Sequence, residues 1–112
     1  MPPAQLSALS VLVFGGPRTL TELATAEQVR PPTMTRIVQS LEAEGLVRRE
    51  RDPRDARVHR LHATAKGRRV MRRGRERRVE NLAKLLERLS ATEVTRVREA
   101  AALVERALAQ QP

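Results

Sequence analysis

One short stretch of the sequence gathers side chains suited to hydrogen bonding with nucleic acid. Two hydroxyl-bearing threonines, a guanidinium, an amide and a serine hydroxyl lie within ten residues: Thr33, Thr35, Arg36, Gln39 and Ser40. Such groups bond base edges in a DNA groove and phosphate oxygens on the backbone. From this stretch alone, a helix that contacts nucleic acid and an ordinary surface helix with polar cover are equally good interpretations.

The same stretch carries signals that place these side chains on a helix of about residues 32–44. Pro31 keeps Arg30 out of the α conformation, and Pro32 suits a first helical turn. Gly45 can take the left-handed conformation that ends a helix. Apolar residues recur at helical spacing and form one face, from which the polar residues largely point away: Met34, Ile37, Val38 and Leu41.

Two shorter helices are predicted upstream, one over residues 5–14 and one that begins after Thr19 and ends near Glu27. Thr19 and Glu22 have the spacing of a capping box, in which each side chain bonds the other residue's backbone N–H. Two short helices joined by a tight turn form a helix-turn-helix, with the second placed for the major groove. An ordinary helical hairpin is the alternative.

A β-hairpin is predicted directly after this helix pair, over residues 46–63. Residues 46–51 and 57–63 have strand character, and residues 52–56 contain the proline and aspartates of a turn. Arginines occur along the whole hairpin: Arg48, Arg49, Arg51, Arg54, Arg57 and Arg60. A hairpin in this position is a wing, whose tip can place an arginine in a narrow minor groove. A solvated basic hairpin is the alternative.

The net charge of +9 is concentrated in one third of the chain. Residues 48–78 hold 14 basic and 4 acidic side chains, whereas residues 79–112 hold 5 of each. Such a patch favours a polyanionic partner, with nucleic acid first. A membrane surface would favour bulky apolar residues opposite the charges, and residues 66–78 offer only Val70 and Met71.

The carboxyl-terminal part, residues 65–112, is predicted to form two amphipathic helices behind a winged region of residues 1–64. Thr64 is the expected N-cap of the first helix, which runs to about Arg88, and Ser90 and Glu93 open the second with a capping box. Their narrow apolar stripes suit an antiparallel pair completed by a partner subunit. The alternative is an intramolecular hairpin that closes on the first helix.

Composition argues against several other classes of protein. Cysteine is absent, and the only two histidines, His59 and His62, are three apart on a predicted strand and so point to opposite faces. We therefore expect no metal site, no cofactor and no catalytic residue. Phe14 is the only aromatic residue, which disfavours single-strand binding by base stacking. No signal peptide or membrane-spanning stretch is evident, so we expect a cytoplasmic, nucleoid-associated protein.

Several motifs together resemble the MarR (multiple antibiotic resistance regulator) family of winged-helix regulators. They are Leu-Thr-Glu-Leu-Ala at 20–24, residues 29–38, Leu-Glu-Ala-Glu-Gly-Leu-Val-Arg-Arg at 41–49, the wing at 51–57 and Thr-Ala-Lys-Gly at 64–67. Leu-Glu-x-x-Gly-Leu-Val is common to many winged-helix groups. The Asp-x-Arg at 55–57, ten residues before Gly67, is much more particular to this family.

The resemblance implies a mainly α fold with a small hairpin wing and carboxyl-terminal dimerisation helices. It implies a homodimer on a palindromic operator in double-stranded DNA, with Thr33, Thr35 and Arg36 facing the major groove and Arg57 reaching the minor groove. Asp55 would orient the wing by pairing with arginines. Repression relieved by a small phenolic or lipophilic ligand is also implied. The expected DNA-contacting residues are Thr21, Pro32, Thr33, Thr35, Arg36, Gln39, Arg49, Arg54 and Arg57.

Two departures from the family pattern affect these expectations. Members usually begin with a longer helix that joins the dimer interface, so either this sequence starts late, the protein is a shortened member, or its last two helices dimerise alone. Ala63 replaces a usual leucine and should anchor the wing less firmly. The charge distribution also leaves open a nucleoid or RNA-binding protein without sequence preference, because phosphate contacts alone give affinity without specificity.

Overall fold

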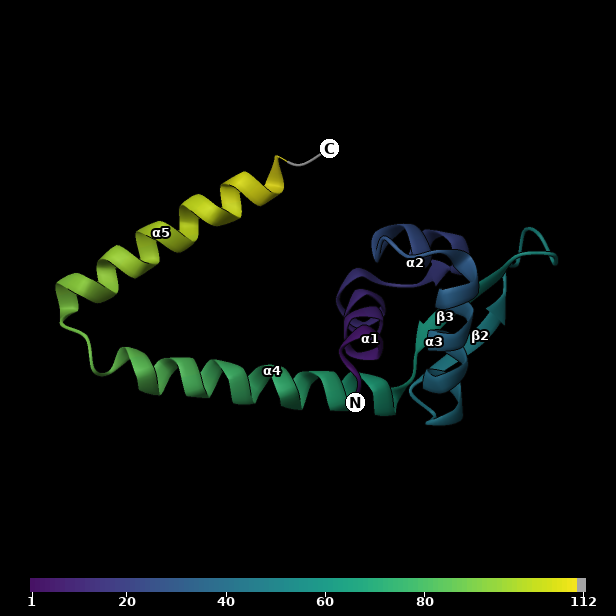
Figure 1. Ribbon diagram of the computed structural model, residues 1–112, viewed down its shortest axis with the longest axis horizontal. Helices are drawn as coiled ribbons and strands as arrows, with labels where there is room; N and C mark the ends of the chain where they lie inside the picture. Colours follow the sequence, from purple (N-terminus) through teal and green to yellow (C-terminus); the bar gives the residue numbers. More distant parts are fainter. Residues whose placement is uncertain (111–112) are drawn as a thin grey trace. The chain divides into compact units, whose positions relative to one another are not determined.

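The computed structural model describes residues 1–110, which form five α-helices and three short strands (Figure 1). Their bounds are α1 (Pro3–Gly15), β1 (Arg18–Thr19), α2 (Leu20–Ala26), α3 (Pro31–Ala43), β2 (Val47–Arg51), β3 (His59–Ala63), α4 (Ala65–Leu86) and α5 (Ala91–Ala109). The predicted fold class, mainly α with a small hairpin, is confirmed. The contacts divide the chain into unit 1, Met1–Arg75, and unit 2, which begins at Glu76 within α4.

The sheet has one strand more than the predicted hairpin. β2 and β3 pair antiparallel with Val47 opposite Ala63 and Arg51 opposite His59. β1 adds to the free edge of β3 and gives the order β1-β3-β2. A two-residue strand has no hydrophobic periodicity to reveal it, so only the tertiary pairing shows it.

Helix ends follow the local signals in the sequence. The capping boxes are confirmed: the Glu22 amide donates to Thr19 Oγ1 at 3.1 Å, and the Glu93 amide donates to Ser90 Oγ at 3.2 Å. α3 ends at Ala43, and Gly45 two residues later turns the chain away with a φ of +73°, which glycine adopts most easily. α3 begins at Pro31, one residue before the predicted start.

Thr64 ties the end of α3 to the start of α4. Its hydroxyl accepts from the Gly67 amide at 3.1 Å, as an N-cap does, and donates to the Gly45 carbonyl at 2.6 Å. Lys66 Nζ donates to the Glu44 carbonyl at 2.8 Å. The last carbonyls of α3 therefore have partners on α4, which fixes how α3 is presented.

The core lies entirely within unit 1 and is aliphatic. Its buried side chains come from α1, α2, α3, the hairpin and α4: Ala8, Leu9, Leu12, Leu23, Ala24, Met34, Val38, Leu41, Leu46, Val47, Leu61, Ala63 and Met71. Because Met34, Val38 and Leu41 of α3 are buried, the opposite face of that helix must point outward.

In unit 2, α5 contains no buried residue. Eight large apolar side chains of this unit expose 36–58% of their surface: Val79, Leu82, Leu85, Leu89, Val97, Leu103, Val104 and Leu108. Leu86 and Val94 are half-buried. Figure 1 shows α5 diverging from the end of α4. The two stripes do not cover each other within a single chain, and the antiparallel pair completed by a partner subunit stays a prediction.

Candidate nucleic-acid interface

The polar face of α3 is open to solvent. Pro32, Thr33, Arg36 and Gln39 are exposed, and Thr35 is half-buried. Arg36 has no hydrogen-bond or ion-pair partner among the described residues, so its guanidinium can meet an external acceptor. Five of the residues predicted to contact DNA thus share one helix face.

Thr35 is restricted in the hydrogen bonds that it can offer. Its hydroxyl donates to the Pro31 carbonyl at 3.0 Å, one turn back along α3. The donor is therefore used within the helix, while the oxygen lone pairs remain free. Toward an external partner the Thr35 hydroxyl can therefore only accept. It can bond a partner's amino group but not a partner's carbonyl oxygen.

The hairpin loop holds Arg57 through Asp55, for which the family resemblance implied pairing with arginines. Asp55 accepts from Arg57 Nε at 3.1 Å and from the Arg57 backbone N–H at 3.0 Å. The Arg57 guanidinium keeps the pKa of Asp55 below its ordinary value. The Arg57 side chain is still 90% exposed, so the pairing orients it without covering it.

A second aspartate in the loop, Asp52, was not among the predicted site residues. Its carboxylate accepts from the Arg54 backbone N–H at 2.8 Å and from Arg60 Nε at 3.0 Å. These two contacts hold the pKa of Asp52 below its ordinary value, the backbone hydrogen bond first. Only its place before Pro53 in a turn could have indicated this role.

Arg60 also joins the hairpin to the start of α2. Its Nη1 lies 3.7 Å from Glu22 Oε1, and the pKa of Glu22 is lowered first by Thr19 and then by Arg60. Glu22 is the second member of the capping box of α2, so one carboxylate serves both the helix start and the hairpin. This link sets the hairpin relative to Thr21, which is exposed on α2.

The two faces of the hairpin differ in charge balance. On one face Glu50 lies 2.7 Å from Arg48 Nη1 and 3.2 Å from His62 Nε2, and Arg48 lowers the Glu50 pKa. On the other face Arg49 pairs opposite Leu61, and Arg51 opposite His59. Arg49 is held by Glu42 of α3 at 3.0 Å. Unlike the first face, the second has no acidic residue in either strand.

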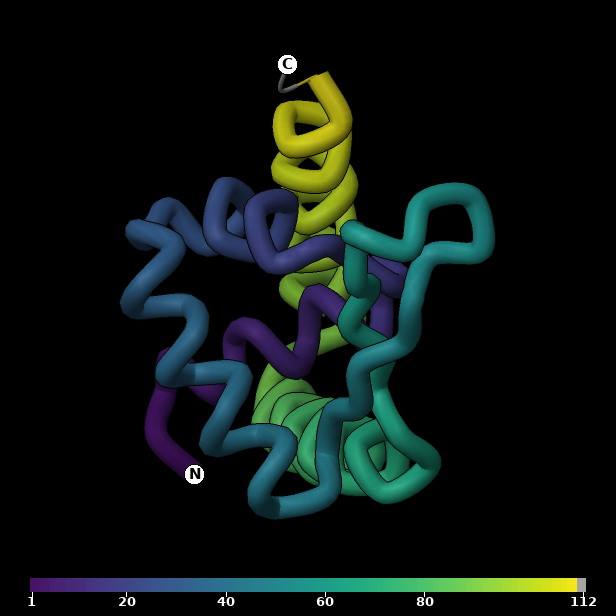
Figure 2. Tube along the Cα trace, turned by 90° about the vertical axis from the view of Figure 1, so that its right-hand side faces the viewer, coloured from purple at the N-terminus to yellow at the C-terminus, as the bar shows by residue number. Residues whose placement is uncertain are grey.

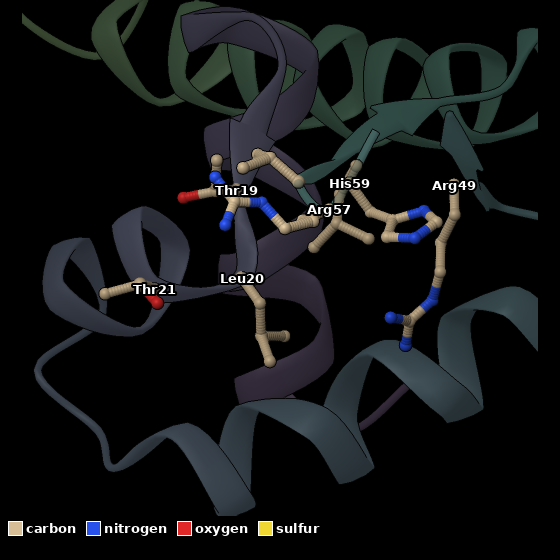
Figure 3. A pocket seen from close by; sticks show the side chains of 8 residues that line it. Thr19, Leu20, Thr21, Arg49, Arg57 and His59 are labelled. Carbon is tan, nitrogen blue, oxygen red and sulfur yellow. The ribbon is translucent and has the colours of Figure 1, made fainter. Parts of the chain in front are cut away.

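An open cleft of about 370 Å³ lies where this face meets β1 and the start of α2 (Figure 3). Its lining combines two hydroxyls, three basic side chains and three aliphatic ones: Thr19, Leu20, Thr21, Arg49, Arg57, Val58, His59 and Leu61. The cleft thus brings together Thr21, Arg49 and Arg57, which the sequence predicted as DNA-contacting residues. His59 was predicted only as an ordinary wing residue.

Figure 2 shows α3 (blue) and the hairpin loop (teal) on the left and right of one view, and in Figure 1 both lie beyond α1 on the same side. Unit 1 therefore presents a polar helix face and an arginine-bearing loop together. This pairing matches the grooves and backbone of a duplex. Over residues 1–110 no three metal-ligating side chains gather, and no helix there is long and apolar enough to cross a membrane.

Comparison with known proteins agrees with this geometry. The sequence profile of the MarR family matches residues 1–59. An uncharacterised helix-turn-helix transcriptional regulator of Mycobacterium bovis is 39% identical over 101 residues, 90% of this chain and 71% of that protein. A helix-turn-helix regulator of Mycobacterium tuberculosis matches to the same extent.

Solved structures show the same fold. A transcriptional regulator of Thermotoga maritima superposes with a TM-score of 0.82 at 32% identity, over 98% of this chain and 80% of that one. A MarR family protein of Bacillus stearothermophilus superposes with a TM-score of 0.86 at 29% identity, over 98% of this chain and 76% of that one. FabT of Streptococcus pneumoniae, solved in complex with DNA, superposes with a TM-score of 0.77 over 96% of this chain and 76% of that one. Its sequence identity is 22%, so this comparison shows a likeness in fold alone.

Proposed function

The chain belongs to the MarR family of helix-turn-helix transcription regulators, and from this premise we propose that it binds a palindromic DNA operator as a homodimer, with one winged region on each half-site. The observation that carries the proposal is the joint exposure of the polar face of α3 and the hairpin arginines on one side of unit 1. Family membership places the chain among regulators rather than enzymes.

In this proposal α3 contacts bases in the major groove. The free guanidinium of Arg36 suits guanine, which presents two acceptors there. Gln39 suits adenine, and Thr35, with its donor already used, suits an amino group of adenine or cytosine. Thr33 lies exposed in the first turn of α3, next to Pro32, where both would meet the DNA edge.

The hairpin supplies the remaining contacts. Arg57, held by Asp55, enters the minor groove, where the negative potential is deep when the groove is narrow. Arg54 and Arg49 bind phosphates on either side, and Thr21 at the start of α2 binds a backbone oxygen. These contacts position the protein, whereas those of α3 give the sequence preference.

The homodimer is supported by unit 2. Its two helices expose apolar stripes that a single chain leaves uncovered. Water-exposed stripes of this length are costly, and two-fold pairing is the commonest way for soluble proteins to bury them. A dimer also matches two winged regions to a palindromic operator.

Repression relieved by a small phenolic or lipophilic ligand belongs to the same proposal, and its support is family membership. Titration of salicylate into the protein–operator complex tests it, with release of the duplex expected. Retention of the duplex at every concentration of salicylate and of a longer-chain phenol would contradict this part of the proposal alone.

The main test is a fluorescence-anisotropy titration at near-physiological salt. A duplex from the gene's own upstream region is compared with a scrambled duplex of equal length. Specific regulators prefer their site roughly 10³-fold or more over other DNA. A preference of this order, saturating at two chains per duplex, supports the proposal, and equal affinity for both duplexes rejects it in favour of binding without sequence preference.

A further inference from the structure

The first half of α4 carries a dense run of basic residues, some of which have structural partners. The run within unit 1 consists of Lys66, Arg68, Arg69, Arg72, Arg73 and Arg75. Lys66 donates to the Glu44 carbonyl at 2.8 Å and Arg68 Nη1 to the Ala63 carbonyl at 2.9 Å. Arg75 lies 5.4 Å from the centre of the Phe14 ring. These three residues fasten α4 to the rest of unit 1.

The other three arginines differ from these. Arg69, Arg72 and Arg73 are all exposed. In residues 1–110 none of them has a hydrogen-bond, ion-pair or aromatic partner. Their side chains are therefore available to an external group.

Helical geometry places the three on one side of α4. Gly67 and Met71 are the buried residues of this helix, so they mark the side that faces the core. Arg69 is three residues from Arg72 and four from Arg73, so the three lie together on the opposite side. Like charges at these spacings destabilise a helix. The exposed Glu76, four residues from Arg72 and three from Arg73, offsets part of this repulsion, and the three arginines leave an excess of positive charge on this side.

We propose that Arg69, Arg72 and Arg73 form a third DNA-contacting surface, which binds the phosphate backbone of a duplex without regard to sequence. This inference rests on duplex DNA being the partner of the chain. Arginine presents a planar fork of donors that matches phosphate oxygens, and it stays charged at any working pH. A duplex carries one negative charge per about 1.7 Å of its axis, so a cluster one helical turn long meets several phosphates.

The neighbouring side chains favour a duplex over a membrane surface. A helix that lies in a membrane interface needs bulky apolar residues beside its charges. Met71 is 2% exposed, and Val70, at 37%, is the one partly exposed apolar residue within this run. The surface around the three arginines is therefore polar, as a phosphate-binding surface requires.

The position of the cluster separates it from the winged contacts. Both Figure 1 and Figure 2 show the first turns of α4 well away from the hairpin loop. The phosphates that it meets lie outside those bound by Arg54 and Arg57. The cluster should therefore lengthen the stretch of DNA that one chain contacts.

The test measures how strongly salt weakens DNA binding. The variant R69Q/R72Q/R73Q removes three charges while retaining good helix formers. The matched control R88Q/R96Q/R106Q removes three exposed charges from the connection after α4 and from α5. Affinity is measured by anisotropy between 50 and 200 mM salt on the upstream and the scrambled duplex.

Each phosphate contact contributes about 0.9 to the slope of log affinity against log salt concentration. The first variant should lower the magnitude of this slope by about 2–3 for each bound chain, and so by about 5 for the proposed dimer, on both duplexes, and their affinity ratio should stay unchanged. The control should keep the slope of the unsubstituted protein.

An unchanged slope in R69Q/R72Q/R73Q would overturn the inference. If the variant also forms a weaker dimer by sedimentation, the arginines belong to the subunit interface. If it instead loses binding to phosphatidylserine vesicles, they belong to a membrane-binding surface. If the unsubstituted protein shows no preference for the upstream duplex, the operator proposal fails, while the slopes still decide this inference.

Discussion

At the scale of single residues, two glycines in unit 1 are required for different physical reasons. Gly45 has a φ of +73° and no atom within 4 Å of where a Cβ would lie. At Gly67 a Cβ would overlap the Leu46 carbonyl oxygen and lie 3.3 Å from Leu9 Cδ1. One position needs glycine for its backbone conformation, and the other needs it for close packing of α4 on the chain that leads into the hairpin.

Exchanging each glycine for alanine separates the two causes. Gly45→Ala should destabilise the protein by about 1 kcal/mol, the cost of a left-handed conformation with a Cβ. Gly67→Ala should cost about 1–3 kcal/mol and exceed Gly45→Ala, because a backbone carbonyl cannot move aside easily. Urea denaturation gives both free energies of unfolding. The reverse order would show that α4 moves freely away from Leu46.

Arg36 is the residue from which we expect the largest share of sequence preference. Arg36→Ala should lower the preference for the upstream duplex by roughly 1–3 kcal/mol, because a bidentate contact to guanine is lost. Competition anisotropy against scrambled DNA measures it, with Arg96→Ala on α5 as the control. An equal loss on both duplexes would mean that Arg36 binds phosphate instead.

At the scale of elements, the hairpin is shaped by its aspartates rather than by a core of its own. Asp52 joins the loop backbone to Arg60, and Arg60 reaches Glu22 at the start of α2. Such surface pairs are individually weak, but here they restrain a short loop that projects from the sheet. The orientation of Arg57 depends on the same loop through Asp55.

Acid should therefore loosen the hairpin before the core unfolds. The folded pKa of Asp52 is below its ordinary value of 3.8. The stabilisation that the Asp52 carboxylate gives the hairpin is thus fully present above pH 3.8. It is lost as the pH falls through the pKa of Asp52 in the folded protein. Heteronuclear NOEs of the Arg54 and Val58 amides should stay constant down to about pH 4 and fall as the pH is lowered below 3.8.

Asp52→Asn isolates the contribution of this carboxylate. At pH 6 the variant should already show lowered NOEs in the loop, and its remaining pH dependence should be smaller. The control Glu87→Gln, in the connection after α4, should show the same pH dependence of the loop NOEs as the unsubstituted protein. A loop equally rigid in Asp52→Asn at pH 6 would assign the restraint to Asp55 and Glu50 instead.

At the scale of the whole molecule, the two units differ in what holds them together. Unit 1 has a continuous aliphatic core, whereas α5 in unit 2 has no buried residue. Exposed aliphatic side chains at helical spacing lower the free energy when they meet a matching surface. We therefore expect the stability of unit 2 to depend on protein concentration.

Leu108→Glu should convert the proposed dimer into a monomer, because Leu108 shares one face of α5 with Val97 and Val104. Burying a leucine contributes about 1.5–3 kcal/mol, and a two-fold interface loses it twice, so the dissociation constant of the dimer should rise roughly 100-fold or more. Sedimentation velocity measures this constant, with Glu99→Gln on the other side of α5 as the control. An unchanged dimer would show that Leu108 lies outside the interface, and a monomeric unsubstituted protein would reject the dimer.

The sequence by itself determined the elements that local physics controls. Proline and glycine bounded α3, capping boxes began α2 and α5, and Thr64 capped α4, because each signal acts through backbone groups a few residues away. The apolar spacing of Met34, Val38 and Leu41 also determined which face of α3 is buried and hence which polar residues are exposed. The family resemblance implied that Asp55 pairs with arginines, and the structure identified Arg57 as its partner.

Only the tertiary structure decided the features that join distant residues. The pairing of β1 with β3, the link from Asp52 through Arg60 to Glu22, and the partners of Lys66 and Arg68 connect residues with no shared periodicity. The same holds for the bond from Thr64 to Gly45, and for the exposure that separates Arg69, Arg72 and Arg73 from their neighbours. Sequence patterns report local geometry, whereas these contacts depend on how the elements pack in space.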